Sequence, residues 1–187
     1  MGEILLRAEN IDKHFGITHA LDNVSFTFNK GEIHALIGEN GSGKSTLTSC
    51  LTGIYQKDSG KFILEGKEIT ATNQVEANHQ GVAIIVQEIG TLSGLTVAEN
   101  IFLGRAIRKG MVIDLKAMER ESKKILDSLN IKINPKTLVK TLSVGYQQMV
   151  EIAKAVSQNA KLLIMDEPSA PLTSAEVEAM FAIVDKL

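Results

Sequence analysis

The sequence predicts an α/β fold with an N-terminal antiparallel β layer and an inserted helical subdomain. Three observations support this prediction. Short apolar runs at 33–37, 82–86 and 162–165 are typical of buried strands. The N-terminal segments instead alternate between apolar and polar residues, as strands with one covered face do. Residues 90–157 carry apolar side chains at helical spacing. We assign 1–89 and 158–187 to the β layer and core, and 90–157 to the helical subdomain, in one domain of 187 residues.

Antiparallel strands and hairpins are expected up to residue 69. Residues 4–11 and 24–28 alternate well enough for half-buried strands, and a turn at 29–32 leads into the buried strand 33–37. Residues 62–69 follow another turn and form a hairpin strand. Phe15 lies on a loop between the first two strands. Its ring either covers the small β layer or stacks on a nucleotide base.

The middle of the chain is predicted to be helical. Thr96 and Glu99 have the spacing of a capping box, and Asp114 can cap the next helix. Another helix follows Leu142–Gly145, and a further capping box, Thr173 to Glu176, begins the last one. The apolar stripes expected to face the core are 115, 118, 125, 126 and 129, then 149, 150, 152, 153 and 156, and finally 177, 180, 181, 184 and 187, with Met111 and Met118 as core filling.

A glycine-rich segment lies between the 33–37 run and an apolar helix, and it is the central feature of the sequence. Strand, glycine turn and helix in series are the context of a phosphate-binding loop. The glycines allow successive N–H groups to point inward at the positive end of a helix. Lys44 adds a cation for the β- and γ-phosphates, and Ser45 places a hydroxyl where Mg²⁺ binds. The predicted binding residues are Gly38, Glu39, Asn40, Gly41, Ser42, Gly43, Lys44, Ser45 and Thr46.

Polar side chains follow two of the predicted buried strands. Asp166 and Glu167 come after 162–165, where Asp166 can hold Mg²⁺ through its water shell and Glu167 can polarise an attacking water. Gln87 follows 82–86, at the sheet edge where α/β proteins bind ligands. Ser143 and Gly145 begin a helix, and such an end attracts anions.

In order and spacing, these motifs resemble the ATP-binding cassette of ABC transporters, a phosphate-loop (P-loop) NTPase with a RecA-like core. The matching segments are Walker A (38–45), the Q-loop glutamine (87), the signature (142–148), Walker B with its glutamate (162–167) and the D-loop (170–173). More narrowly, 15–24, 38–41 and 142–145 resemble the first cassette of bacterial simple-sugar importers, the ribose, galactose and xylose group.

The resemblance implies ATP and Mg²⁺ as cofactors and a role for each site residue. Catalysis would rest on Glu167, Gln87 and Lys44, and the metal would be held at Ser45, Gln87 and Asp166. Phe15 would stack on adenine. Ser143 and Gly145 would close over the γ-phosphate held by a second cassette.

The same resemblance implies the partners and the location. These are the membrane-embedded permease, a second cassette and an extracytoplasmic sugar-binding protein, with this chain cytoplasmic on the inner face of the cell membrane. The apolar runs are too short to cross a bilayer. A net charge of −2 with dispersed basic residues argues against a nucleic-acid partner.

Several positions depart from the family pattern. Val144 replaces the general glycine of the signature, Tyr146 stands where glutamine is usual in the sugar-importer group, and Pro171 would stiffen the D-loop. Family members continue with a strand that carries a switch histidine, so we expect this chain to be C-terminally incomplete. The four histidines, at 14, 19, 34 and 79, are interpreted as structural or surface residues.

Two alternative functions share every nucleotide motif. One is a soluble ABC ATPase that acts on ribosomes or DNA without transport. The other is a nucleotide-binding remnant without turnover. The sugar-importer form of the motifs favours transport over the first alternative, but the sequence does not identify the sugar, because selectivity lies in the other subunits.

Overall fold

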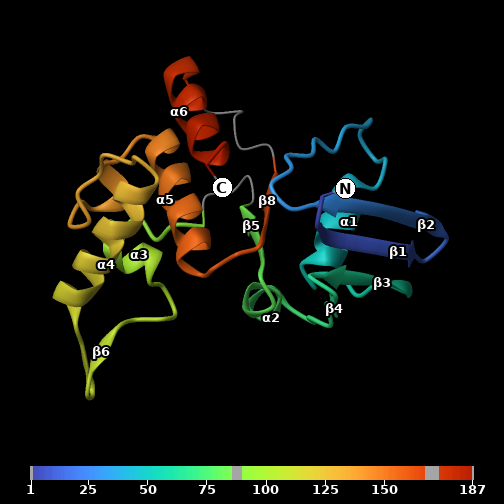
Figure 1. The fold of residues 1–187 in the computed structure, drawn as a ribbon, viewed down its shortest axis with the longest axis horizontal. Coiled ribbons are helices and arrows are strands. Elements are labelled where there is room, and N and C mark those ends of the chain that lie inside the picture. Colours follow the sequence, from blue (N-terminus) through green and yellow to red (C-terminus); the bar gives the residue numbers. More distant parts are fainter. Residues whose placement is uncertain (1, 86–89, 167–172, 187) are drawn as a thin grey trace. The chain divides into compact units, whose positions relative to one another are not determined.

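The structure, a computed structural model, is mixed α/β and describes residues 2–85, 90–166 and 173–186 (Figure 1). Gln87, Glu167, Pro171 and Leu187 lie outside these ranges. The chain divides into two compact units, one formed by Met1–Ala83 with Ala160–Ile164 and the other by Ile84–Asn159 with Met165–Leu187. No helix within the described ranges is both long enough and apolar enough to cross a membrane.

The first unit is built on a four-stranded antiparallel sheet, which confirms the predicted N-terminal β layer. Its strands β1 (Ile4–Phe15), β2 (Thr18–Asn29), β3 (Ser59–Leu64) and β4 (Lys67–Glu68) have the order β2-β1-β3-β4. One face of the sheet forms a core cluster with helix α1 (Lys44–Leu51). The buried side chains of that cluster include Leu6, Ala8, Ile11, Leu47, Cys50, Leu51, Phe62 and Leu64.

The predicted buried strand at 33–37 is wrong for this structure. The segment has no strand assignment, and Ile33 and Ile37 are 66% and 89% exposed. A strand exists only where a neighbouring backbone pairs with it, and no strand in the described part of the chain does so here. An apolar run indicates that a segment can be buried, but it does not supply the partner.

Strands β5 (Val82–Ile85) and β8 (Leu162–Met165) pair with each other, and both were predicted from their apolar runs. Helix α2 (Gln74–His79) precedes β5 and is capped by Asn73. The N–H of Asp166 donates to the carbonyl oxygen of Ile85 at 2.9 Å, which fixes Asp166 directly after the end of β8.

The second unit is mainly helical. It contains α3 (Val97–Ile101), α4 (Leu115–Ser128), a 3₁₀ turn η1 (Val139–Thr141), α5 (Val144–Ser157) and α6 (Ser174–Val184). Thr96, Asp114, Ser143 and Thr173 cap α3, α4, α5 and α6, and the capping boxes at Thr96 and Thr173 are both formed, as predicted. Buried side chains on these helices include Val97, Ile101, Met118, Leu126, Met149, Val150, Ile152, Met180 and Ile183.

Some predicted core positions of this unit are wrong. Met111 is 94% exposed, because it lies in the turn of a hairpin formed by β6 (Arg108–Lys109) and β7 (Val112–Ile113) that the sequence did not predict. Leu115 and Phe181 are also exposed. Leu115 is the first residue of α4, two positions before the buried Ala117, and Phe181 directly follows the buried Met180. Ile183, which was not in the predicted stripe, is buried instead.

Candidate functional site

Helix α1 begins without a cap, which distinguishes it from the other α-helices of the described residues. Its N-cap position is Gly43, no side chain accepts a hydrogen bond from its first turn, and that turn contains no acidic residue. Helices α2 to α6 each begin with a side-chain cap from Asn, Thr, Asp or Ser. The first N–H groups of α1 therefore remain available for an anion at the positive end of the helix dipole.

Backbone geometry explains why glycine stands before α1. Gly43 has φ of 89°, and a Cβ there would lie 2.6 Å from the carbonyl oxygen of Ala20 on β2. Gly41 has φ of 84° with open space around it. Both positions favour glycine because their backbone is left-handed. At position 43 a second reason applies, because any side chain would collide with β2.

Lys44 supplies the positive charge of the loop. Its ammonium donates to the carbonyl oxygens of Gly38 and Glu39, at 2.7 and 2.8 Å, and to the hydroxyl of Ser42 at 3.4 Å. The ammonium thus lies across its own loop, beside the uncapped helix end. Ser45 is exposed on the first turn of α1. A polyphosphate with a bound Mg²⁺ matches this combination of free amides, one ammonium and one hydroxyl.

Phe15 is the last residue of β1 rather than a loop residue, so that detail of the prediction is wrong. Its ring is 42% exposed, and Tyr55 meets it edge-on with ring centroids 5.1 Å apart. The N–H of Tyr55 donates to the carbonyl oxygen of Ser49 on α1 at 3.1 Å, which ties this aromatic pair to the helix that follows the loop. Sequence reasoning missed Tyr55, because no local pattern reveals which rings meet.

The second unit contains another of the predicted site elements, the N-terminus of α5. Ser143 caps this helix and donates to Oε1 of Glu176 at 2.5 Å. The other carboxylate oxygen of Glu176 accepts from the N–H and hydroxyl of Thr173, at 3.0 and 2.9 Å. The hydrogen bond from Ser143 and those from Thr173 lower the pKa of Glu176, with a smaller contribution from the N–H of Gly145. This helix end therefore does attract an anion, here a carboxylate of the same chain.

The predicted site residues fall into two sets. Phe15 and the loop 38–46 belong to the first unit, while Asp166, Ser143 and Gly145 belong to the second. Gln87 and Glu167 lie outside the described residues. Glu176 was interpreted only as part of a capping box, and its contact with Ser143 spans 33 positions of sequence, which no local pattern predicts.

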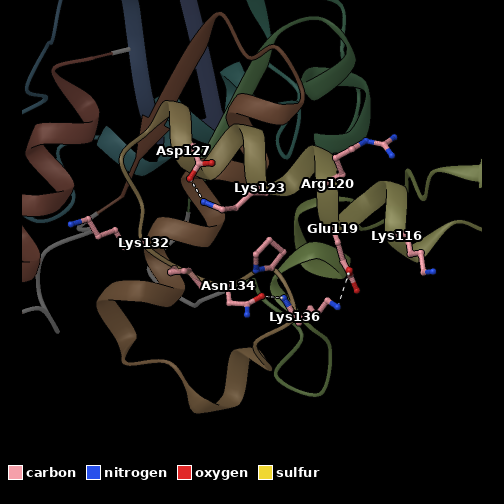
Figure 2. A pocket seen from close by; sticks show the side chains of 10 residues that line it. Lys116, Glu119, Arg120, Lys123, Asp127, Lys132, Asn134 and Lys136 are labelled. Atoms are coloured by element: carbon pink, nitrogen blue, oxygen red, sulfur yellow. Dashed lines mark hydrogen bonds and ion pairs between the residues drawn. The ribbon is translucent and has the colours of Figure 1, made fainter.

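A hollow of about 650 Å³ lies on the second unit, between α4 and residues 132–136 (Figure 2). Its lining is strongly charged and contains five basic and two acidic residues. Lys136 pairs with Glu119 at 3.4 Å and Lys123 pairs with Asp127, so part of its charge is neutralised locally. None of the predicted nucleotide-binding residues lines it. The lining residues are Lys116, Glu119, Arg120, Lys123, Asp127, Lys132, Ile133, Asn134, Pro135 and Lys136.

Residues 21–170 match the family model described as ABC transporter. The chain is also similar to the galactose/methyl galactoside import ATP-binding protein MglA of Escherichia coli K12, with 50% identity over 186 residues, and to that of Sodalis glossinidius, with 49% identity. Each alignment covers 100% of this chain but 37% of the relative, so the chain spans little more than a third of their length.

Solved structures agree with this fold. A crystal structure of the ADP conformation of an ATP-binding cassette from an ABC transporter superposes with a TM-score of 0.84 and 34% identity, covering 98% of this chain and 76% of that one. A nucleotide-free ATP-binding cassette gives a TM-score of 0.84 and 33% identity over the same shares.

Proposed function

The chain belongs to the ABC transporter family, and we propose that it binds Mg-ATP at the loop 38–46 and hydrolyses it as one half of a cassette dimer. The uncapped N-terminus of α1, with Lys44 beside it, is the observation on which this proposal rests. Every other described α-helix fills that position with a side chain of its own. A polyphosphate completes the first turn of α1 in the way that those caps complete the others.

Each predicted residue then has a defined task. Lys44 would exchange the carbonyl oxygens of its own loop for the β- and γ-phosphates, while the loop amides would stabilise the charge that develops during transfer. Ser45 and Asp166 would hold Mg²⁺, which would neutralise charge on the phosphates. Gln87 would serve the metal and the γ-phosphate, and Glu167 would orient the attacking water. Phe15 would stack on adenine, and the edge-on contact with Tyr55 would hold the Phe15 ring in place.

The N-terminus of α5 completes the site of a second cassette. Ser143 and Gly145 would donate to the γ-phosphate held by the partner's loop, in the place where Glu176 now lies in its own chain. ATP binding would close this dimer and hydrolysis would reopen it. In this proposal 1–89 and 158–187 form the core, and 90–157 form the subdomain that contacts the membrane-embedded permease.

The relatives named above import galactose or methyl galactoside, and a sugar of that class is the transported substrate that we propose here. The complete system would include an extracytoplasmic sugar-binding protein, with this chain on the cytoplasmic face of the membrane. Crosslinking from a cysteine at Leu92, which is exposed, to a cytoplasmic helix of the permease tests the docking face. Crosslinks to ribosomal proteins instead would favour a non-transport ATPase.

Steady-state phosphate release tests the enzymatic part of the proposal. Glu167→Gln is expected to lose turnover and keep ATP binding, whereas Lys44→Ala loses both. The measurement uses the chain within its complete transporter, reconstituted in proteoliposomes, so that uptake of radiolabelled galactose is recorded together with phosphate release. Turnover that persists in Glu167→Gln would refute the assignment of that carboxylate.

A further inference from the structure

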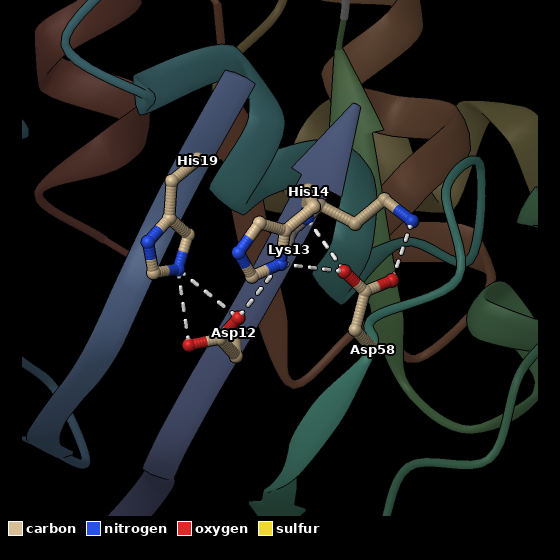
Figure 3. Close-up of polar contacts among 5 residues, drawn as sticks. All are labelled: Asp12, Lys13, His14, His19 and Asp58. Carbon is tan, nitrogen blue, oxygen red and sulfur yellow. Dashed lines mark hydrogen bonds and ion pairs between the residues drawn. The ribbon is translucent and has the colours of Figure 1, made fainter. Parts of the chain in front are cut away.

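The closed end of the β1–β2 hairpin gathers two histidines and an aspartate outside the nucleotide site. His14 and His19 face each other across the strands, next to the pair Phe15 and Thr18 that closes the turn. Asp12 lies two residues before His14 on β1 (Figure 3). One ligand atom from each of Asp12, His14 and His19 lies within 4.8 Å of the others.

The distances within this cluster match those between neighbouring ligands of one metal ion. Oδ1 of Asp12 lies 3.2 Å from Nδ1 of His14 and 3.1 Å from Nε2 of His19. Tetrahedral zinc with bonds of about 2.0–2.1 Å to nitrogen and oxygen places its ligand atoms roughly 3.3 Å apart. The carboxylate therefore already lies between the two imidazoles at nearly the required spacing.

One rearrangement is needed before the nitrogens can share a metal. The rings of His14 and His19 are stacked, with centroids 3.9 Å apart and planes within 11° of each other. A ring nitrogen coordinates in the plane of its ring, so both rings must turn about χ2. That torsion is broad for histidine, and both side chains are substantially exposed, which leaves space for the movement.

The charges around the cluster favour a cation. Asp58 accepts from Lys13 Nζ at 2.9 Å and from the backbone N–H of His14 at 2.6 Å, and its Oδ2 lies 3.2 Å from Nδ1 of His14. With both imidazoles neutral, Asp12, Asp58 and Lys13 together carry one net negative charge. The ammonium of Lys13 pairs with Asp58 and lies 5.2 Å from the ring centroid of Phe15. Lys13 therefore pairs with Asp58 rather than with Asp12, whose carboxylate faces the two histidines.

We propose that Asp12, His14 and His19 form a binding site for a divalent transition metal, with Zn²⁺ as the best match. Two imidazoles and one carboxylate suit zinc, whereas Mg²⁺ prefers oxygen ligands alone. Water completes the coordination. Asp58 holds the backbone of His14 and lies beside the ligand set. The site is distinct from the Mg²⁺ of the nucleotide site, and it would fix the hairpin end that carries Phe15.

Calorimetric titration of ZnCl₂ into tag-free, EDTA-treated and nucleotide-free protein tests the proposal. We expect one Zn²⁺ per chain. His14→Gln and His19→Gln should each weaken zinc binding by at least about 10–100-fold. Replacing a residue that only supports a metal ligand already lowers metal affinity by about that factor. His79→Gln, an exposed histidine on α2, is the matched control and should bind like the wild type. Circular dichroism establishes that the variants are folded.

Two further measurements make the result independent of those variants. Imidazole NMR spectra of the wild type should show zinc-dependent shifts of His14 and His19 but not of His79. Co²⁺ in place of Zn²⁺ should give the intense visible bands of a four-coordinate site. Absence of binding, or zinc affinity that is unchanged when both His14 and His19 are glutamine, would overturn the proposal and leave the cluster as a network of hydrogen bonds.

Discussion

At the scale of single residues, Gly41 and Gly43 of the proposed phosphate loop make a paired test of the backbone. Gly41→Ala imposes a left-handed backbone on alanine, which costs about 1–2 kcal/mol. Gly43→Ala imposes the same strain and also places a Cβ 2.6 Å from the carbonyl oxygen of Ala20. We therefore expect the second variant to lose more unfolding free energy than the first. Chemical denaturation without nucleotide measures both, and equal losses would contradict the close approach of Gly43 to β2.

Asp58 gives a prediction for acid stability. Hydrogen bonds from the Lys13 side chain, then from the His14 backbone, lower the pKa of this carboxyl to about 2. A depressed folded-state pKa contributes stability that is present above the unfolded pKa, about 3.9, and is lost as the pH falls toward 2. Wild-type unfolding free energy should thus decline between about pH 4 and pH 2 more steeply than that of Asp58→Asn. Identical slopes for the two proteins would contradict the interaction.

At the scale of elements, contacts between residues close in sequence were predictable and those between distant segments were not. The capping boxes at Thr96 and Thr173 formed as expected because each is contained in four consecutive residues. The prediction of a strand at 33–37 was wrong because a strand depends on a pairing partner elsewhere in the chain. The prediction that Met111 fills the core was wrong because it lies in a hairpin of two-residue strands, and such short strands leave no periodicity in the sequence.

The proposed nucleotide site shows the same difference between local and distant contacts. The loop 38–46 could be identified from consecutive residues, since a strand-like run, glycines, lysine and serine in that order have one common use. Only the structure reveals that α1 is the one α-helix among the described residues that lacks a side-chain cap. The edge contact of Tyr55 and the hydrogen bond from Ser143 to Glu176 join segments whose pairing is set by packing, and no pattern in the sequence encodes them.

Helix α6 is joined to α5 through Glu176, and this contact can be tested directly. Glu176→Ala removes the acceptor of Ser143 and half of the capping box of α6. Amide hydrogen exchange of the first turn of α6 should become faster, while Glu178→Ala, an exposed glutamate on the same helix, should leave it unchanged. Because the pKa of Glu176 is lowered, the protection should persist above the ordinary glutamate pKa and fade in more acidic solution. Equal exchange in both variants would contradict the contact.

At the scale of the whole molecule, the proposed residues divide between two units of one chain and, in the proposed dimer, between two chains. The first unit holds the phosphate loop and Phe15, and the second holds Ser143 and Gly145. In the proposed function, nucleotide binding would depend mainly on the first set, whereas hydrolysis would need both sets together with Glu167. A measurement of Mg-ATP binding therefore tests the loop 38–46 separately from Glu167 and the second unit.

The most direct test is calorimetric titration of Mg-ATP into the wild type and Lys44→Ala, with Lys67→Ala, an exposed lysine on β4, as the matched control. We predict that the wild type and Lys67→Ala bind with equal affinity and that Lys44→Ala shows no measurable binding while unfolding at the same temperature as the wild type. Unchanged ATP affinity in a folded Lys44→Ala variant would contradict the assignment of the loop 38–46 as the nucleotide site.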